Sequence, residues 1–118
     1  MRKSLIIYVF FGLLLSQISP NKANIEKVIE CITPNTSAIM LPNLIGNKPN
    51  WAILKQKLIE LKREDIYLIE DSADTMTTTQ ETDVSTVSFY ASHLITAGGM
   101  GGMVMVNNKD HEKRTLMI

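Results

Sequence analysis

The chain has 118 residues, 45% of them hydrophobic, and its twelve Lys and Arg residues balance twelve Asp and Glu residues. This length suits one domain at most, and zero net charge argues against both a basic nucleic-acid-binding protein and an acidic disordered tail. A single cysteine excludes a disulfide framework and a cysteine-ligated cluster within the chain, and two histidines leave little for a metal site, so we expect no metal.

The first twenty residues fit two interpretations. Arg2 and Lys3, followed by the apolar residues 5–15, resemble a signal peptide, although the apolar run is too short for a membrane span and no small-x-small cleavage site follows. Residues 5–11 are also rich in Ile, Val, Phe and Tyr, which favours a buried strand. Composition alone does not choose between a leader and a strand.

Helix and strand patterns then alternate. Apolar residues at i, i+3, i+4 and i+7 predict a helix over residues 22–32, and residues 37–41 form a short apolar run closed by Pro42 that predicts a buried strand. Asn50 is placed to cap a second helix, and residues 66–69 predict another strand. This order is typical of an α/β fold with a mostly parallel sheet and flanking helices.

The C-terminal part predicts a loop and a strand pair. Residues 75–82 are polar and β-branched without a helical period, which indicates a surface loop. Residues 84–89 and 103–106 predict strands, and the Gly-Gly-Met-Gly-Gly run at 98–102 lies between them. We expect these strands to be antiparallel, because a parallel pair needs a longer crossover. A final helix is predicted from about Asn108.

Two segments carry groups suited to chemistry at the carboxyl ends of strands, where open parallel sheets bind ligands. One is Glu-Asp-Ser-Ala-Asp at 70–74, and the other is Ser-Phe-Tyr-Ala-Ser-His at 88–93. A carboxylate can keep a ring nitrogen protonated, a serine can bind phosphate, and a histidine can move protons near neutral pH. Taken singly, each group also has a structural explanation, such as a loop-capping Asp71 or a structural His93.

The combination of motifs is more specific than its parts. In chain order, the sequence has Ile-Glu-Asp-Ser-Ala-Asp-Thr at 69–75, a Ser-Phe-Tyr-x-x-His stretch within 86–96, and the glycine motif with its following strand at 98–104. Together they resemble the sugar aminotransferase family named for DegT, DnrJ and StrS, from about residue 24 to 114. The segment at 38–47 is also similar to the family.

The resemblance implies the fold and setting of the chain. We expect part of a pyridoxal-phosphate (PLP) transferase of fold type I, with residues 1–118 an incomplete piece of the cofactor-binding large domain. Its apolar N-terminal run then corresponds to a family strand. This correspondence favours a buried strand over a signal peptide, and it implies a cytoplasmic location. Residues 1–20 precede the matching motifs and are the least secure part of this alignment. The family also implies a homodimer for the full-length protein.

Four residues receive roles from the resemblance. Asp71 matches the acid that pairs with the pyridine nitrogen of the cofactor, and Asp74 stands where the family usually has Gln near the cofactor ring. Ser88 matches the serine that helps to bind the cofactor phosphate. His93 holds the place of the lysine that binds the cofactor covalently, which makes it the candidate catalytic residue.

The exchange of lysine for histidine is found in one branch of the family, the 3-dehydrases that act on nucleotide-linked 4-keto-6-deoxy sugars. These use pyridoxamine phosphate (PMP), held without a covalent bond, and their histidine removes a proton. The resemblance thus implies a nucleotide-sugar enzyme of deoxysugar or lipopolysaccharide biosynthesis, with PLP or PMP as cofactor and no membrane or nucleic acid as partner.

Alternatives remain open at the level of sequence. They are a divergent aminotransferase that lost its lysine, a non-catalytic remnant, and a small secreted protein, the last of which depends on residues 1–19. Residues 75–82 lack the glycine-containing insert that the family usually has. We expect the chain by itself to be inactive, because the family's phosphate pocket and most sugar contacts lie outside it.

Overall fold

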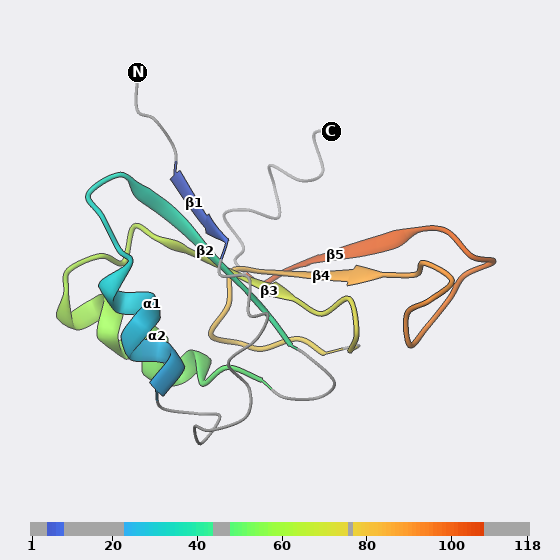
Figure 1. Ribbon diagram of the computed structural model, residues 1–118, viewed down its shortest axis with the longest axis horizontal. Helices are drawn as coiled ribbons and strands as arrows, with labels where there is room; N and C mark the ends of the chain where they lie inside the picture. Colours follow the sequence, from blue (N-terminus) through green and yellow to red (C-terminus); the bar gives the residue numbers. More distant parts are fainter. Residues whose placement is uncertain (1–4, 9–22, 44–47, 76, 108–118) are drawn as a thin grey trace.

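The strands of this protein form one sheet. The computed structural model describes residues 5–8, 23–43, 48–75 and 77–107. The elements in chain order are β1 (Leu5–Tyr8), α1 (Ala23–Glu30), β2 (Thr36–Pro42), α2 (Trp51–Glu60), β3 (Tyr67–Asp71), β4 (Val84–Ser88) and β5 (Gly102–Val106). The sheet has the order β1-β2-β3-β4-β5 (Figure 1). Strands β1 to β4 are parallel, and the predicted α/β class is confirmed.

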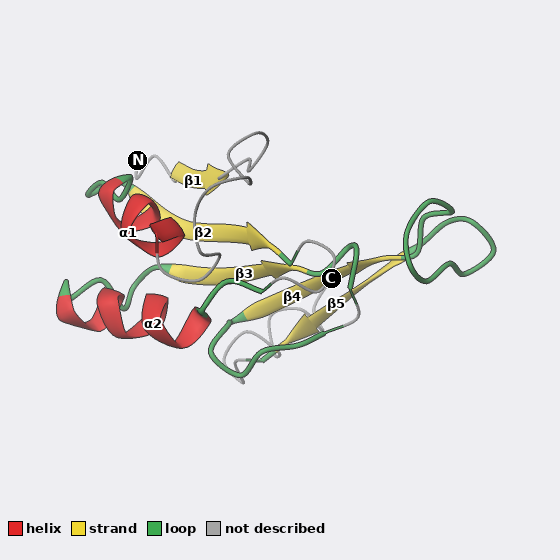
Figure 2. Cartoon of the chain, turned by 60° about the horizontal axis from the view of Figure 1, so that its bottom comes forward, coloured by secondary structure: helices red, strands yellow, loops and turns green. Residues whose placement is uncertain are grey.

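Both helices pack on one face of the sheet, over β2 and β3 (Figure 2). The side chains of Ile39 and Leu68, which are register partners in β2 and β3, face the helices and are almost fully buried. The buried core consists of Ile25, Val28, Ile39, Leu41, Trp51, Leu54, Leu58, Ile66 and Leu68. The inward-facing apolar side chains of the strands and those of the helices therefore pack together in a single layer.

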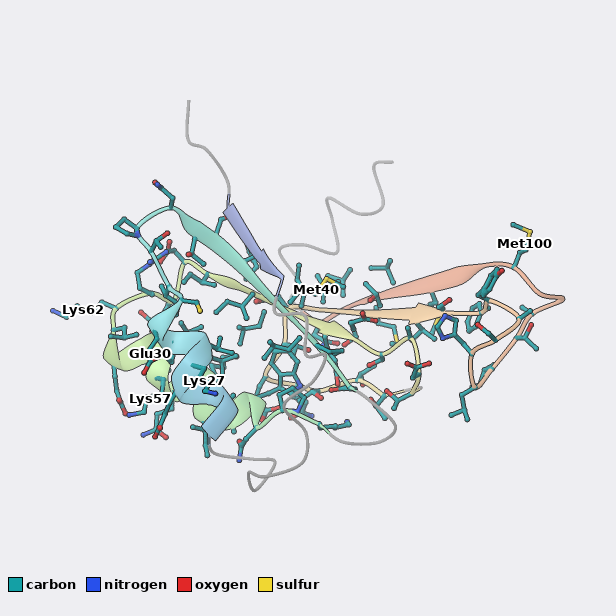
Figure 3. The ribbon with its side chains drawn as sticks, in the orientation of Figure 1. Lys27, Glu30, Met40, Lys57, Lys62 and Met100 are labelled. Atoms are coloured by element: carbon teal, nitrogen blue, oxygen red, sulfur yellow. The ribbon has the colours of Figure 1, made fainter. Side chains whose placement is uncertain are left out.

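The sequence signals for the start of α2 are confirmed in atomic detail. The side chain of Asn50 accepts a hydrogen bond from the backbone N–H of Ile53 at 3.1 Å, as a capping residue does. The outer sides of the helices are charged, with Lys27, Glu30 and Lys57 lying there (Figure 3). Lys57 donates a hydrogen bond to Glu60 at 2.9 Å, which raises the pKa of the lysine.

The connection between β3 and β4 corrects one expectation. Residues 75–82 were expected to form a surface loop, and the described part of this segment is a loop without a helix or strand. It is only partly on the surface, because Thr75 and Thr82 are 7% and 2% exposed. The hydroxyl group of Thr75 forms a hydrogen bond with that of Thr77, and the hydroxyl group of Thr82 donates to Thr79 O. Because these polar groups have partners within the protein, the polar composition of the loop did not indicate solvent exposure.

The β4–β5 hairpin confirms the prediction of an antiparallel pair. The two strands pair from Val84↔Val106 to Ser88↔Gly102, and the backbone N–H of Phe89 donates to Gly101 O at 2.9 Å. The connecting loop extends away from the helices (Figures 1 and 2). Met100 lies near its tip (Figure 3) and is 79% exposed.

Two predictions concern the ends of the chain. The predicted N-terminal strand is present as β1, paired in parallel with β2, while residues 9–11 of that prediction lie outside the described residues. The final helix expected from Asn108 also lies outside them. Within the described ranges, no helix has both the length and the apolar character needed to cross a membrane.

The tight start of β5 leads to a stability prediction. A Cβ atom added at Gly102 would lie 2.9 Å from the carbonyl oxygen of Val87, a backbone atom that cannot move aside freely. We expect Gly102→Ala to lower the free energy of unfolding by about 1–3 kcal/mol, measured from urea denaturation curves. The control is Gly98→Asn, because Gly98 has a φ of +64° that Asn tolerates and no atom near the new Cβ. Equal stability of the two variants would contradict the close approach.

Candidate functional site

The site lies where β3 and β4 end at the same edge of the sheet. Asp71 is the last residue of β3 and pairs with Thr86 of β4. Ser88 follows Thr86 by two residues, so it points to the same face of the sheet as Asp71. The parallel pairing thus brings two of the predicted site residues to one face and one edge.

Both of these side chains keep an atom available for a ligand. Oδ1 of Asp71 accepts a hydrogen bond from the backbone N–H of Ala73 at 3.1 Å, while no described residue bonds to Oδ2. Oγ of Ser88 accepts from the backbone N–H of Tyr90 at 3.3 Å, which leaves its hydroxyl hydrogen to be donated elsewhere. The first offers a negative acceptor and the second a neutral donor.

The two other predicted residues bind each other. Nδ1 of His93 lies 2.9 Å from Oδ1 of Asp74, and their side chains are 26% and 45% exposed. Asp74, expected near a cofactor ring, thus lies against the imidazole of the candidate catalytic residue. The Tyr90 ring stands edge-on to that of His93, with 6.2 Å between ring centroids. Within the described part of the chain, Nε2 of His93 has no hydrogen-bond partner.

A second carboxylate, Glu70, lies on the opposite face of β3. Its side chain is completely buried, because alternation along the strand turns it toward the helices while Asp71 faces the other way. Oε1 accepts hydrogen bonds from Asn43 Nδ2 and from Thr79 Oγ1, the latter at 2.8 Å, and Oε2 accepts one from Ser85 Oγ at 2.8 Å. These donors offset the cost of removing the carboxylate from water.

The Glu70 network also holds the backbone around Asp71. The backbone N–H of Asn43 donates to Asp71 O at 2.8 Å, and its side-chain amide reaches Ser72 Oγ at 3.1 Å. The backbone N–H of Ser72 donates to Thr86 O at 2.8 Å. Asp71 is therefore fixed on both sides, by residues that the family resemblance did not single out.

One sequence signal could have found this network. A charged residue at the i+2 position after the buried Leu68 must occupy the same buried face of the strand, and so Glu70 needs donors. Ser85, its register partner on β4, was a candidate from the pairing of parallel strands. The contributions of Asn43 and Thr79 come from loops, and no spacing in the sequence predicts them.

The half-buried side chains at this edge carry groups of the kinds that bind PLP or PMP. Asp71 Oδ2 is an acceptor suited to a protonated pyridine nitrogen, the Ser88 hydroxyl is a donor suited to a phosphate oxygen, and His93 Nε2 is a nitrogen suited to proton transfer. Among the described residues, no group of three or more His, Cys, Asp or Glu could hold a metal ion.

The buried carboxylate supports a further stability prediction. Glu70→Gln keeps the size of the side chain but replaces one acceptor oxygen with an NH₂ donor, which then faces other donors. We expect a loss of about 1–3 kcal/mol in the free energy of unfolding, measured by urea denaturation. Glu60→Gln is the matched control, because Glu60 is 50% exposed and its loss should change stability by less than about 0.5 kcal/mol. Equal losses in the two variants would show that the hydrogen bonds of Glu70 do not stabilise the fold more than an exposed ion pair does.

Comparisons with known proteins point to one family. The sequence profile of the DegT/DnrJ/EryC1/StrS aminotransferase family matches residues 11–118. A dTDP-4-dehydro-2,6-dideoxy-D-glucose 3-dehydratase from Saccharopolyspora spinosa is 29% identical over 100 residues, which cover 78% of this chain and 21% of that protein. The lipopolysaccharide biosynthesis protein RfbH of Salmonella typhimurium is 33% identical over 89 residues, covering 70% of this chain and 20% of that protein.

Solved structures show the same arrangement of elements. The crystal structure of NtdA from Bacillus subtilis with bound PMP superposes with a TM-score of 0.62 at 25% identity, over 73% of this chain and 20% of that one. This likeness confirms the expected fold, a part of a PLP transferase of fold type I. The chain spans about a fifth of the length of these proteins. From the extent of the profile match, the chain belongs to the DegT/DnrJ/EryC1/StrS aminotransferase family.

Proposed function

We propose that this chain is part of the cofactor-binding large domain of a PMP-dependent enzyme that removes the 3-hydroxyl group from a nucleotide-linked 4-keto-6-deoxy sugar. The observation that carries this proposal is His93, which the resemblance aligns with the family's lysine and whose Nε2 has no hydrogen-bond partner among the described residues. Similarity to a sugar 3-dehydratase and to a lipopolysaccharide biosynthesis protein supports the same reaction class.

Asp71 and Ser88 bind and orient the cofactor in this proposal. The Asp71 carboxylate accepts a hydrogen bond from the ring nitrogen at Oδ2 and keeps that nitrogen protonated. Ser88 donates its hydroxyl hydrogen to the phosphate. A protonated pyridine ring draws electrons from the carbon beside its amino group, which is the chemistry that the cofactor supplies.

His93 moves the proton. An imidazole cannot form the covalent bond that the lysine of the aminotransferases makes with the cofactor, so the cofactor is free to arrive and stay as an amine. With the cofactor bound, Nε2 of His93 would be the general base that accepts a proton in this reaction. Asp74 lies against Nδ1 of His93, so Nε2 is the ring nitrogen that can accept a proton.

The family also supports proposals about the whole protein. We propose a nucleotide-linked keto sugar as substrate, a homodimer as the working unit and the cytoplasm as its location, since the resemblance implies all three. A divergent aminotransferase and a non-catalytic remnant are the competing functions. The two experiments below test the assignment on which the proposed reaction depends, a non-covalent cofactor site with a histidine at position 93.

The first experiment tests the histidine position. PLP and borohydride are added to the chain and to His93→Lys, and labelled residues are identified by peptide mass spectrometry. We expect a label at residue 93 in the variant alone, because an amine there can react with the cofactor aldehyde and imidazole cannot. His93→Asn serves as the matched control without an amine. Selective labelling of another lysine in the unchanged chain would mean that this lysine is the anchor and the assignment of His93 is wrong.

The second experiment tests Asp71. The dissociation constant for PMP is measured by equilibrium dialysis at millimolar concentration, because the chain alone is expected to bind weakly. Asp71→Asn should weaken binding by about 10- to 100-fold, since a charge-assisted hydrogen bond contributes roughly 1.5–3 kcal/mol. Glu60→Gln, which removes an exposed carboxylate on α2, should bind as the unchanged chain does. Unaltered binding by Asp71→Asn would remove Asp71 from the cofactor site.

A further inference from the structure

Among the described residues, the side chain of Asp74 makes its hydrogen bond to the candidate base, His93. Its Oδ1 lies 2.9 Å from Nδ1 of His93. We propose that Asp74 is a positioning residue that accepts the Nδ1 proton of His93, so that Nε2 is the unprotonated nitrogen of the neutral ring. The proposal rests on the proposed function only in taking His93 as the base, since the contact itself is independent of any cofactor.

The chemistry of the two side chains gives this assignment. An ionised carboxylate can only accept hydrogen bonds, and a neutral imidazole has one N–H group. A hydrogen bond between Asp74 and Nδ1 therefore places the proton on Nδ1 and leaves the lone pair on Nε2. In water, the neutral ring favours the opposite form with the proton on Nε2. The carboxylate thus reverses the preference of a free histidine, and it does so in the direction that a base acting through Nε2 requires.

The loop that presents Asp74 is ordered by its own hydrogen bonds. The backbone N–H of Ala73 donates to Asp71 Oδ1 at 3.1 Å, and that of Thr75 donates to Ser72 O at 3.1 Å. These bonds form a turn directly after β3, with Asp74 inside it. The carboxylate is consequently held in place by the same strand end that presents Asp71.

The loop that presents His93 is ordered in a similar way. The backbone N–H of Tyr90 donates to Ser88 Oγ at 3.3 Å, and the backbone N–H of His93 donates to Tyr90 O at 3.0 Å. The Tyr90 ring meets the imidazole edge-on, with an angle of 67° between the rings. The remaining freedom of the imidazole is rotation about its own side-chain bonds, and the hydrogen bond to Asp74 restricts that rotation.

The Asp74–His93 pair contributes little to folding. Asp74 is 45% exposed, and ion pairs that are this exposed to solvent add little to the stability of a fold. Removing the carboxylate should therefore leave the fold intact while it frees the ring. This separates a positioning role from a structural one, and it makes the tautomer of His93 a direct measure of the proposal.

The test is ¹⁵N NMR of the imidazole nitrogens in histidine-labelled chain, in solution or as a hydrated sediment. The chain has two histidines, and His111→Gln leaves the signals of His93 alone. At a pH where the ring is neutral by its own titration, we expect Nδ1 at the shift of a protonated nitrogen and Nε2 at that of an unprotonated one. Asp74→Ala should move the ring to the form with the proton on Nε2, with an unchanged circular dichroism spectrum.

Two further variants complete the test. Glu64→Ala removes an exposed carboxylate before the start of β3 and should leave the tautomer unchanged. Asp74→Glu keeps a carboxylate and should restore at least part of the Nδ1-protonated form. A ring already protonated at Nε2 in the unchanged chain, or an unaltered tautomer in Asp74→Ala, would overturn the proposal.

Cofactor binding distinguishes positioning from direct contact. Asp74→Ala should bind PMP with an unchanged dissociation constant under the conditions used for Asp71→Asn. A loss as large as that of Asp71→Asn would make Asp74 a cofactor ligand and overturn the positioning role. Failure of the proposed function would appear differently, as absence of PMP binding or labelling of another lysine, while the tautomer of His93 still responded to Asp74.

Discussion

The buried carboxylate of Glu70 connects the elements on which the site depends. It lies at zero exposure between β3 and β4, and three hydrogen-bond donors from β4 and two loops meet its two oxygens. A carboxylate in such a place is costly unless it is satisfied, so the donors must stay where they are. The segment after β2, the connection between β3 and β4, and the strand β4 itself are thereby held at one edge of the sheet.

Strand alternation turns this structural constraint into support for chemistry. Glu70 and Asp71 are neighbours in sequence but point to opposite faces of β3. The side chain of Glu70 binds the loops, and that of Asp71 has an oxygen, Oδ2, to which no described residue bonds. At this edge, the face of the sheet with Glu70 is held by hydrogen bonds, and the opposite face, with Asp71, can bind a ligand. A preorganised site requires such support behind its binding groups.

The proposed base and its partner are presented from two different strand ends. Asp74 follows β3 and His93 follows β4, and the parallel pairing of these strands brings the two loops together. In a family whose members usually carry a lysine at this place, the imidazole changes what the position can do. In the proposed function, it exchanges covalent attachment of a cofactor for proton transfer alone, and the carboxylate of Asp74 orients the ring.

The sequence predicted the strands and helices well because the signals for them are local. Apolar spacing indicated both helices, Asn50 indicated the start of α2, and the short glycine-rich connection indicated the antiparallel β4–β5 pair. Motif resemblance placed Asp71 and Ser88 at strand ends, where the structure has them. These features depend on neighbouring residues and on the periods of helix and strand.

Only the tertiary structure decided the contacts between distant segments. The bond between Asp74 and His93 joins residues that the sequence separates by a whole strand, and no local pattern pairs the two. The burial of Thr82 in a polar loop came from donors and acceptors gathered by folding, which composition cannot indicate. By itself, the sequence determined which groups reach the edge of the sheet, because strand period and turn chemistry are local. Which of those groups bind one another was decided by the packing of the sheet, since it alone brings the ends of β3 and β4 together.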